Sequence, residues 1–338
     1  MTNETIRAAP PPPAPAPGQG FPLATRDASF SNAAGLLIQS MPCALARFGV
    51  LLAASVVALI WLVITLGGTA LLADRVAGAF GVIWLVGCLA AAGFVWGTLL
   101  RYVLHLIECG HVAVLTELIT KGSFPASGES MFAHGKRVVT ERFGQANVLF
   151  GLNMLVRGIV QAFHRTLDWI ADILPLPGLD SLSRLINIVL RAATRYLDKV
   201  IFSYSLTRPG IDAWQASREG LVYYCQNAKP VLKTAMWSVV LEYVTSAVLW
   251  LLLLVPAGLI TYALPAASRE WGGIVTIVVA VLLLGPLRSA FIKPVFLIMM
   301  MVRFHTAIEG QAVNPEWDAR LAGISDKFRN FGQKAAFA

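Results

Sequence analysis

Two long uncharged stretches lie next to each other in the N-terminal third of the chain. Residues 48–73 contain no charged side chain over 26 positions, residues 76–100 contain none over 25, and only Asp74 and Arg75 separate them. A helix needs about 20 apolar residues to cross the hydrocarbon core of a bilayer, and it satisfies its own backbone groups there. The break leaves room only for a tight turn. The sequence therefore predicts a transmembrane helical hairpin.

Two further apolar stretches lie in the C-terminal half of the chain. Residues 235–265 contain a single acid, Glu242, and the only charged residues of 271–302 are Arg288 and Lys293. The composition agrees with a membrane location, because 57% of the residues are hydrophobic, 14% are charged and the mean hydropathy is +0.67. We predict an all-α integral membrane protein in which two transmembrane helical hairpins, about four spans, flank a large amphipathic region.

The fourth apolar stretch is too long for one straight span. Pro286 follows Gly285 in it, and Pro294 follows Lys293. Proline removes a backbone donor and bends a helix. We expect a kink at these prolines, followed by a segment in the membrane interface at residues 296–301.

The apolar stretches divide the chain into five regions. Before the first span, residues 9–20 (APPPPAPAPGQG) are rich in proline and cannot pack a core, which predicts an extended, solvated arm. The expected regions are a disordered arm at 1–46, the first hairpin at 47–100, amphipathic cytoplasmic or interfacial helices at 101–234, the second hairpin at 235–303 and a cytoplasmic tail at 304–338.

Lysine and arginine are unevenly distributed around the predicted spans. Each short turn holds one arginine, whereas Arg26 and Arg47 precede the first span and Arg218 and Lys233 precede the third. By the positive-inside rule, both termini and residues 101–234 face the cytoplasm. The expected location is the inner membrane of the cell. The net charge of +8 then sets the orientation and contacts anionic lipid. Because the basic residues are dispersed, we expect no nucleic-acid partner.

The central region carries two predicted amphipathic helices. Residues 148–170 and 182–204 have apolar residues at helical spacing, and Arg184, Arg191 and Arg195 lie on the polar side of the second stretch. These helices can lie in the membrane interface with the arginines at the level of lipid phosphates, or they can pack together as a cytoplasmic bundle. Their long apolar faces favour the interface and membrane lipids as partners. Whether the start of the first helix crosses the membrane stays open.

Three stretches of the C-terminal half resemble one known family. They are residues 142–164 (RFGQANVLFGLNMLVRGIVQAFH), residues 196–204 (YLDKVIFSY), and the positions Ala213, Ala216, Gly220 and Asn227 ahead of the third span. Together they resemble the C-terminal half of the choline transporter-like family, over residues 140–330 at most. The resemblance implies transport of a small solute. Family members have more spans than the chain has here, which puts transport by one protomer in doubt.

A short stretch after the second span contains residues capable of metal ligation. His105, Glu108, Cys109 and His111 (HLIECGH) fall within seven positions. On a helix at most three of them share a face, and no second cluster is present, so we expect no metal and no cofactor. The sequence also lacks a nucleophile elbow, an H-E-x-x-H motif and a glycine-rich phosphate loop. We therefore expect no catalytic residues and no enzyme.

Glu242 is the most informative single residue of the second hairpin. An unpaired carboxylate inside a span is costly, so Glu242 needs a partner. Arg288 lies at a similar depth in the antiparallel fourth span, because a helix rises about 1.5 Å per residue. Two interpretations stay open: a structural ion pair, or a site at which Glu242 binds a proton or a cationic substrate.

The second span is rich in small residues. Gly93 and Gly97 form a GxxxG pair, which allows two helices to approach closely. The sequence does not distinguish packing within one chain from a seam between copies in a homo-oligomer.

These observations favour two classes of function. The first is transport or binding of a small amphiphilic or cationic solute or lipid, which the family resemblance implies. The alternative is a non-transporting membrane scaffold, or lipid-interaction protein, that acts through interfacial helices.

Overall fold

The computed structural model describes residues 23–124, 128–141, 193–208, 210–211, 213–324 and 328. Every regular element among these residues is a helix. Several predicted features lie outside the described residues, namely the proline-rich stretch 9–20, the first amphipathic helix, Arg184, Arg191 and the family-like stretch 142–164.

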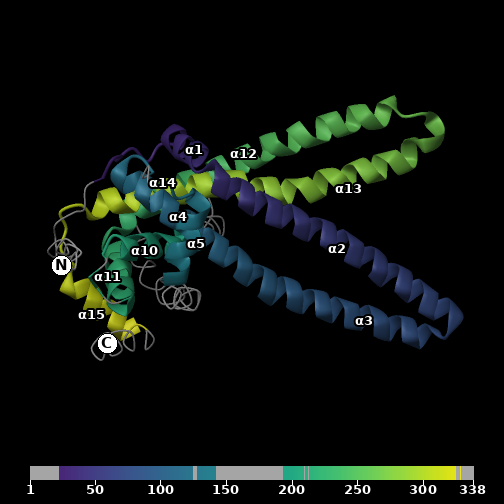
Figure 1. The fold of residues 1–338 in the computed structure, drawn as a ribbon, viewed down its shortest axis with the longest axis horizontal. Coiled ribbons are helices and arrows are strands. Elements are labelled where there is room, and N and C mark those ends of the chain that lie inside the picture. Colours follow the sequence, from purple (N-terminus) through teal and green to yellow (C-terminus); the bar gives the residue numbers. More distant parts are fainter. Residues whose placement is uncertain are drawn as a thin grey trace, which may run out of the picture.

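Two long helical hairpins leave a helical head on the same side and spread apart toward their tips (Figure 1). The first consists of α2 (Met41–Arg75) and α3 (Gly78–Phe94), and the second of α12 (Ala228–Ala263) and α13 (Arg269–Leu287). With their continuations into the head, they supply four helices long and apolar enough to cross a membrane. The predicted all-α membrane fold with about four spans is confirmed.

Apolar side chains cover the outside of both hairpins. Val63 and Ile83 on the first hairpin, and Leu252 and Ile277 on the second, are each more than half exposed. Such a surface is unfavourable in water and is stable against lipid tails. The two hairpins are therefore the membrane-embedded part of the protein.

Close contact between α2 and α3 depends on two glycines near the tip. A side-chain carbon at Gly81 would lie 2.8 Å from the carbonyl oxygen of Thr69, and one at Gly68 would overlap the indole ring of Trp84. Small residues let the two backbones approach, which is how helices gain packing energy inside a bilayer. Asp74 and Arg75, where the sequence predicts the tight turn, are the last residues of α2, and the turn itself is at Val76 and Ala77.

Both returning arms pass through a π-helical segment where they enter the head. The first has η1 (Val95–Leu100) before α4 (Arg101–Lys121), and the second has η3 (Arg288–Ile292) before α14 (Lys293–Ile308). A π-helix locally changes the direction of side chains and often marks a functional position. The second π-helix lies between the two prolines at which the sequence predicts a kink.

The interfacial position expected for residues 296–301 is wrong. Phe296, Ile298, Met300 and Met301 are almost completely buried inside the head. The α1 helix, α10 and α12 all contact α14. A uniformly apolar segment suits a protein core as well as a lipid surface, so its sequence alone did not separate the two locations.

The head consists of short helices around α14. Besides α4, they are α1 (Phe30–Gln39), α5 (Met131–Glu141), α10 (Leu197–Leu206), α11 (Ala213–Gln226) and α15 (Pro315–Ile324). Aromatic residues fill the centre, where Tyr204 and Tyr224 contact Phe304. The hydroxyl of Tyr224 donates to the carbonyl oxygen of Ala193 at 2.6 Å, which satisfies its polar atom in the core.

The described part of the central region therefore packs as a bundle. Val200, Ile201 and Phe202 of α10 are fully buried, although the sequence analysis favoured an interfacial location for the helix that contains them. The reason is that α10 is covered by α4, α11 and α14, so its apolar residues face protein.

The boundary of the expected disordered arm at 1–46 is also wrong. Residues from Phe30 onward are helical, and Ala33, Leu36 and Leu37 of α1 are buried in the head core. Ser29 caps α1, because its Oγ accepts a hydrogen bond from the amide of Asn32 at 3.3 Å. Helix α15, in the expected tail, docks on α11.

Candidate functional site

A group of charged side chains lies where the hairpins enter the head. Its first part centres on Glu108 of α4, which accepts a hydrogen bond from Nη2 of Arg47 on α2. Lys199 of α10 lies between two acids, with its Nζ 3.1 Å from Glu108 and 2.8 Å from Asp198. His105 of α4 lies 4.0 Å from Asp198. This part of the network joins the first hairpin to the centre of the head.

Lys199 keeps its charge in this setting. Burial opposes the charged form of the amine, but Asp198 and Glu108 outweigh burial and raise the pKa of Lys199. A charged lysine between two carboxylates neutralises most of the repulsion between those acids. The arrangement is a structural clamp across α4 and α10.

The second part of the network centres on Glu242 of α12. Its Oε1 lies 2.9 Å from Nη2 of Arg288, so the two residues that the sequence placed at similar depth are in contact. Its Oε2 lies 2.8 Å from Nη1 of Arg195, which the sequence analysis assigned to the lipid surface. Arg195 is about half exposed and also lies over the ring of Tyr196.

Arg47 connects the two parts. Its Nη2 donates to Oγ of Ser289 at 3.1 Å, and Ser289 follows Arg288 in the π-helix η3. Lys293, at the start of α14, interacts electrostatically with Arg47, Arg195, Glu242 and Arg288. Both hairpins are thereby tied to each other by charged groups at their base.

The network has more cations than acids. Its five cationic side chains are Arg47, Arg195, Lys199, Arg288 and Lys293, and its three acids are Glu108, Asp198 and Glu242. Nε of Arg47 and Nε of Arg288 are buried and have no hydrogen-bond acceptor within the described parts of the chain. The local excess of positive charge favours an anion nearby and disfavours a cation.

The residues of the HLIECGH stretch make contacts with separate partners. His111 interacts with Ser40 at 2.9 Å, Glu108 binds Arg47 and Lys199, and the sulfur of Cys109 lies 3.6 Å from His105. Among the described residues no group of three or more metal-ligating side chains comes together. Within the described residues, the side chains of this stretch contact different partners.

A serine and a histidine meet in the core without forming an accessible site. Oγ of Ser203 lies 2.7 Å from Nε2 of His305 and 2.8 Å from Oγ1 of Thr116. Ser203 is completely buried and His305 nearly so. A nucleophile needs access to substrate, so these contacts join α4, α10 and α14 as a buried polar link.

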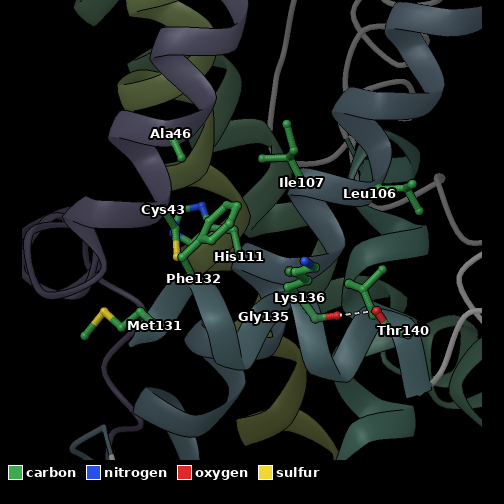
Figure 2. Close-up of a pocket in the computed structure, with 12 residues that line it drawn as sticks. Cys43, Ala46, Leu106, Ile107, His111, Met131, Phe132, Gly135, Lys136 and Thr140 are labelled. Carbon is green, nitrogen blue, oxygen red and sulfur yellow. Dashed lines mark hydrogen bonds between the residues drawn. The ribbon is translucent and has the colours of Figure 1, made fainter. Parts of the chain in front are cut away.

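An apolar cleft of about 260 Å³ lies beside the network, between α2, α4 and α5. Cys43 and Ala46 line it from α2, while α5 contributes Phe132 on one side and Lys136 with Thr140 further along the helix (Figure 2). Most of the surface is aliphatic or aromatic. The volume is close to the lower end of small-molecule pockets, about 300 Å³.

Two glycines set the width of the cleft. A side-chain carbon at Gly135 of α5 would lie 2.8 Å from the carbonyl oxygen of Gly110 on α4. The two helices therefore cross at nearly direct backbone contact. Phe132 of α5 lies beside Cys43 of α2 at one side of the cleft (Figure 2).

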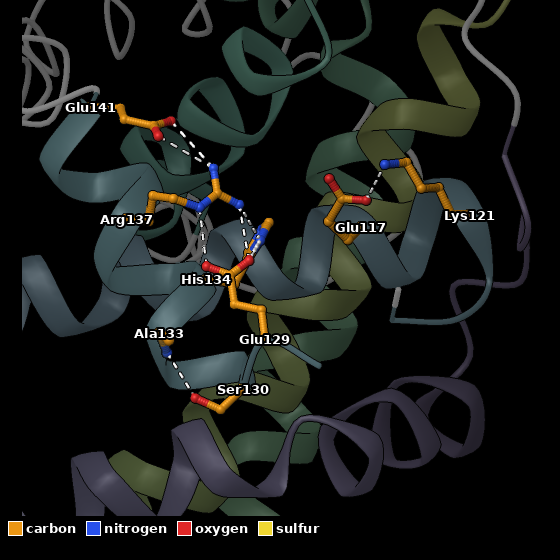
Figure 3. A network of polar contacts seen from close by, with 8 residues as sticks. All are labelled: Glu117, Lys121, Glu129, Ser130, Ala133, His134, Arg137 and Glu141. Carbon is orange, nitrogen blue, oxygen red and sulfur yellow. Dashed lines mark hydrogen bonds and ion pairs between the residues drawn. The ribbon is translucent and has the colours of Figure 1, made fainter. Parts of the chain in front are cut away.

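A polar network fixes the outer face of α5 (Figure 3). The guanidinium of Arg137 donates to Glu129 at 3.0 Å and to Glu141 at 3.3 Å, and it also contacts His134. Hydrogen bonds from Arg137 lower the pKa of Glu129, because they favour its charged form. Arg137 is thus neutralised by acids, while Lys136 has no ion-pair partner within the described part of the chain.

The predicted GxxxG pair makes no close contact within the described chain. An added side-chain carbon at Gly93 or Gly97 would meet no atom within 4 Å. Both residues are on the exposed surface of the first hairpin. Of the two readings that the sequence allowed, the structure does not support a seam inside one chain.

The sequence analysis missed four members of the network. Arg47 was read only as a charge that sets orientation, Lys293 only as a charged residue of the fourth apolar stretch, and Asp198 and Lys199 only as part of the family-like stretch 196–204. One sequence feature does indicate a buried charge network here: two adjacent, opposite charges lie between Leu197 and Val200. Charged side chains in an apolar helix need partners.

Comparison of the chain with protein-family models, with curated proteins and with solved structures finds no match.

Proposed function

We propose that the protein binds an anionic amphiphile, such as a fatty acid or a lipid with one accessible chain, in the cleft between α2, α4 and α5. The observation that carries this proposal is the pairing of an apolar cleft with a cation, Lys136, that lacks an acidic partner in the described residues. An apolar tail gains about 0.8 kcal/mol for each methylene that it buries. The lysine supplies an attraction for a negative headgroup.

The position of the cleft supports a ligand that comes from the membrane. Leu45, next to Ala46 on α2, is 53% exposed, and Phe132 at the edge of the cleft is 56% exposed. An exposed apolar rim at the start of a transmembrane helix gives a lipid chain a continuous path from the bilayer. A ligand dissolved in water has no need of such a rim.

The charge of the neighbouring network favours an anion over the cationic solute that the family resemblance implies. Five cations and three acids gather at the base of the hairpins, and both oxygens of Glu242 are occupied by arginines. A cationic substrate would have to displace a guanidinium from that carboxylate. We therefore assign Glu242 and Arg288 a structural role in the proposed function.

We propose further that the head and both termini are cytoplasmic and that the hairpins cross the inner membrane. The short turns that join the helices of each hairpin then face outward.

The four native cysteines are buried, so a cysteine introduced at an exposed position is the main target for a thiol reagent. Ser268→Cys in the distal turn should react with a membrane-impermeant maleimide in intact cells. Glu316→Cys on α15 should react only after permeabilisation, and the reverse pattern would invert this orientation.

The cleft is tested with a fatty acid that carries a photoreactive diazirine. Ala46→Phe places a ring in the cleft and should lower cross-linking to α4 and α5 about tenfold, the effect of excluding two methylenes. Ala53→Phe is the matched control, because it makes the same substitution at an exposed residue two turns further along α2 that does not line the cleft, and it should leave cross-linking unchanged. Equal loss in both variants, or none in Ala46→Phe, would refute the proposed site.

The headgroup preference is tested with two amphiphiles of equal chain length. A carboxylate should bind more tightly than a trimethylammonium compound, and Lys136→Glu should reverse that order by reversing the sign of the local charge. Lys121→Glu at the end of α4, where Lys121 pairs with Glu117, is the control for net charge. Tighter binding of the ammonium compound to the unmodified protein would refute the anionic preference.

A non-transporting scaffold is the second candidate function. The observation that favours it is the outward spread of the two hairpins (Figure 1). Most of the apolar side chains along both hairpins are exposed rather than packed against protein. Solute transport requires a path lined by protein. Proteoliposomes that contain the protein should therefore show no uptake of labelled choline, and saturable uptake would instead support the transport that the family resemblance implies.

A further inference from the structure

A second groove lies on another side of the head, between α12, α14 and the segment before α1. Its volume is about 460 Å³, which is larger than the 260 Å³ of the α5 cleft. Polar and apolar side chains both contribute to it. Its lining residues are Ala28, Pro230, Lys233, Thr234, Trp237, Leu241, Met299 and Arg303.

Side chains along the α12 face of this groove follow an order from charged to apolar. Lys233, Trp237 and Leu241 are spaced four residues apart, so they lie on one face of the helix. Lys233 and Leu241 are about 12 Å apart along the axis at a rise of 1.5 Å per residue. Trp237 is 54% exposed and stands where the exposed apolar surface of the second hairpin begins, followed by Val240.

This order matches the layers of a membrane surface. Tryptophan is enriched at the level of the headgroups, between the phosphates and the acyl chains. Lys233 then lies on the aqueous side of Trp237, at phosphate depth, and Leu241 lies on the hydrocarbon side. The groove crosses the boundary between the two layers.

The cations of the groove are positioned from two different helices. Nε of Arg303 on α14 donates to Oγ1 of Thr234 at 3.2 Å, and that hydroxyl donates to the carbonyl oxygen of Pro230 at 3.1 Å. Lys233 is exposed and makes no ion pair with any described residue. Asp27, which interacts electrostatically with Arg303, already accepts two hydrogen bonds from Ser29.

We propose that this groove binds one anionic phospholipid from the leaflet next to the head. The phosphate lies between Lys233 and Arg303, Trp237 packs against the glycerol and ester region, and the first acyl carbons lie on Leu241 and Met299. This groove shares no residue with the amphiphile cleft, so the test of one site does not depend on the other. The expected ligand is a lipid because an acyl chain fills the apolar half of the groove.

The site is tested by native mass spectrometry of the full chain in detergent, titrated with phosphatidylglycerol or phosphatidylcholine. Lys233→Gln with Arg303→Gln should weaken phosphatidylglycerol binding about 30-fold, because each cation near an anionic lipid contributes about 1 kcal/mol. Lys121→Gln with Arg320→Gln removes the same charge from exposed ion pairs on α4 and α15 and should change binding less than twofold. Equal weakening by both pairs would show a non-specific charge effect and overturn the proposal.

Two further measurements distinguish a lipid site from a folding defect and from a site for free phosphate. Lys233→Gln alone changes an exposed side chain, so it should fold normally and still weaken binding about fivefold. Millimolar inorganic phosphate should leave the bound phosphatidylglycerol in place, because phosphate has no apolar part. Displacement by phosphate, or an unchanged affinity in Lys233→Gln, would overturn a lipid site here, whereas Ala46→Phe should have no effect on it.

Discussion

Arg288 donates to Glu242 at 2.9 Å across the base of the second hairpin, from the π-helix η3 to α12. The contact fixes the returning arm against the outgoing arm at the point where the chain enters the head. Arg195 holds the second carboxylate oxygen at 2.8 Å. Glu242 is thus the acid on which the head and the second hairpin converge.

Removing this acid should destabilise the protein. Glu242→Gln leaves Arg195 and Arg288 without their carboxylate, at an expected cost of about 3 kcal/mol, the lower end for a buried pair because both arginines are partly exposed. Thermal unfolding in detergent measures the loss. Adding Arg288→Met to Glu242→Gln should recover part of it, since one of the two unpaired charges is then gone.

The control for this cycle is Arg269→Gln at the start of α13, which removes an arginine that donates to backbone carbonyl oxygens. It should shift the unfolding temperature little. Strictly additive effects of the changes at 242 and 288 would show that the two residues are not coupled, in spite of their contact.

Lys199 should stabilise the head over the whole neutral range of pH. Asp198 and Glu108 raise its pKa above the ordinary value of 10.5, so the folded state binds the proton more tightly than the unfolded state. The resulting stability is fully present below the unfolded pKa and is lost as pH rises through the folded pKa. Lys199→Met, which also leaves two acids facing each other, should cost about 3 to 5 kcal/mol.

The measurement is the difference in unfolding temperature between the wild type and Lys199→Met. This difference should be constant between about pH 6 and pH 9 and should decrease only above about pH 10.5. Lys121→Met, at an exposed ion pair on the same helix as Glu108, is the control with little effect. A difference that already falls between pH 6 and pH 9 would contradict a raised pKa.

Some of these features could be predicted from the sequence and others could not. The hairpins follow from two pairs of long apolar stretches with short breaks, because hydrophobicity and length alone decide whether a helix can span a bilayer. The contact between Glu242 and Arg288 follows from helical rise across a short turn. Both predictions use only local geometry.

The rest depends on tertiary packing. Arg47 and Glu108 lie 61 residues apart and meet only because α2 and α4 enter the head side by side. No local pattern encodes such a pair. The burial of Phe296 in α14 likewise depends on α1, which the sequence analysis assigned to a disordered arm because a proline-rich stretch precedes it.

The crossing of α4 and α5 gives an asymmetric prediction for two glycines. A methyl group at Gly135 would lie 2.8 Å from the carbonyl oxygen of Gly110, so Gly135→Ala must push α5 away and should cost about 1 to 3 kcal/mol. A methyl group at Gly110 would lie 3.4 Å from its nearest neighbour, an ordinary contact. Gly110→Ala should therefore be neutral, or stabilising by up to about 1 kcal/mol through helix propensity.

Thermal unfolding of the two variants under identical detergent conditions tests the asymmetry. Gly135→Ala should also reduce binding of the diazirine fatty acid, since Gly135 lines the cleft. Equal stability of the two alanine variants would show that α4 and α5 are further apart than the structure places them.

Substitutions at the exposed glycines of the first hairpin distinguish packing inside one chain from packing between copies of the chain. Gly93→Leu and Gly97→Leu add large side chains at positions where an added side-chain carbon meets no atom within 4 Å. Each should therefore change the free energy of unfolding of the protomer by less than about 0.5 kcal/mol. Gly81→Leu is the matched control on the same helix. It adds the same side chain 2.8 Å from the carbonyl oxygen of Thr69 and should strongly destabilise the hairpin.

Light scattering of each variant in detergent then gives its mass. Gly93→Leu with normal stability and a reduced mass would locate an intermolecular seam at this face, because only a second copy would have been displaced. A large loss of stability in Gly93→Leu at unchanged mass would contradict the open surroundings of this residue.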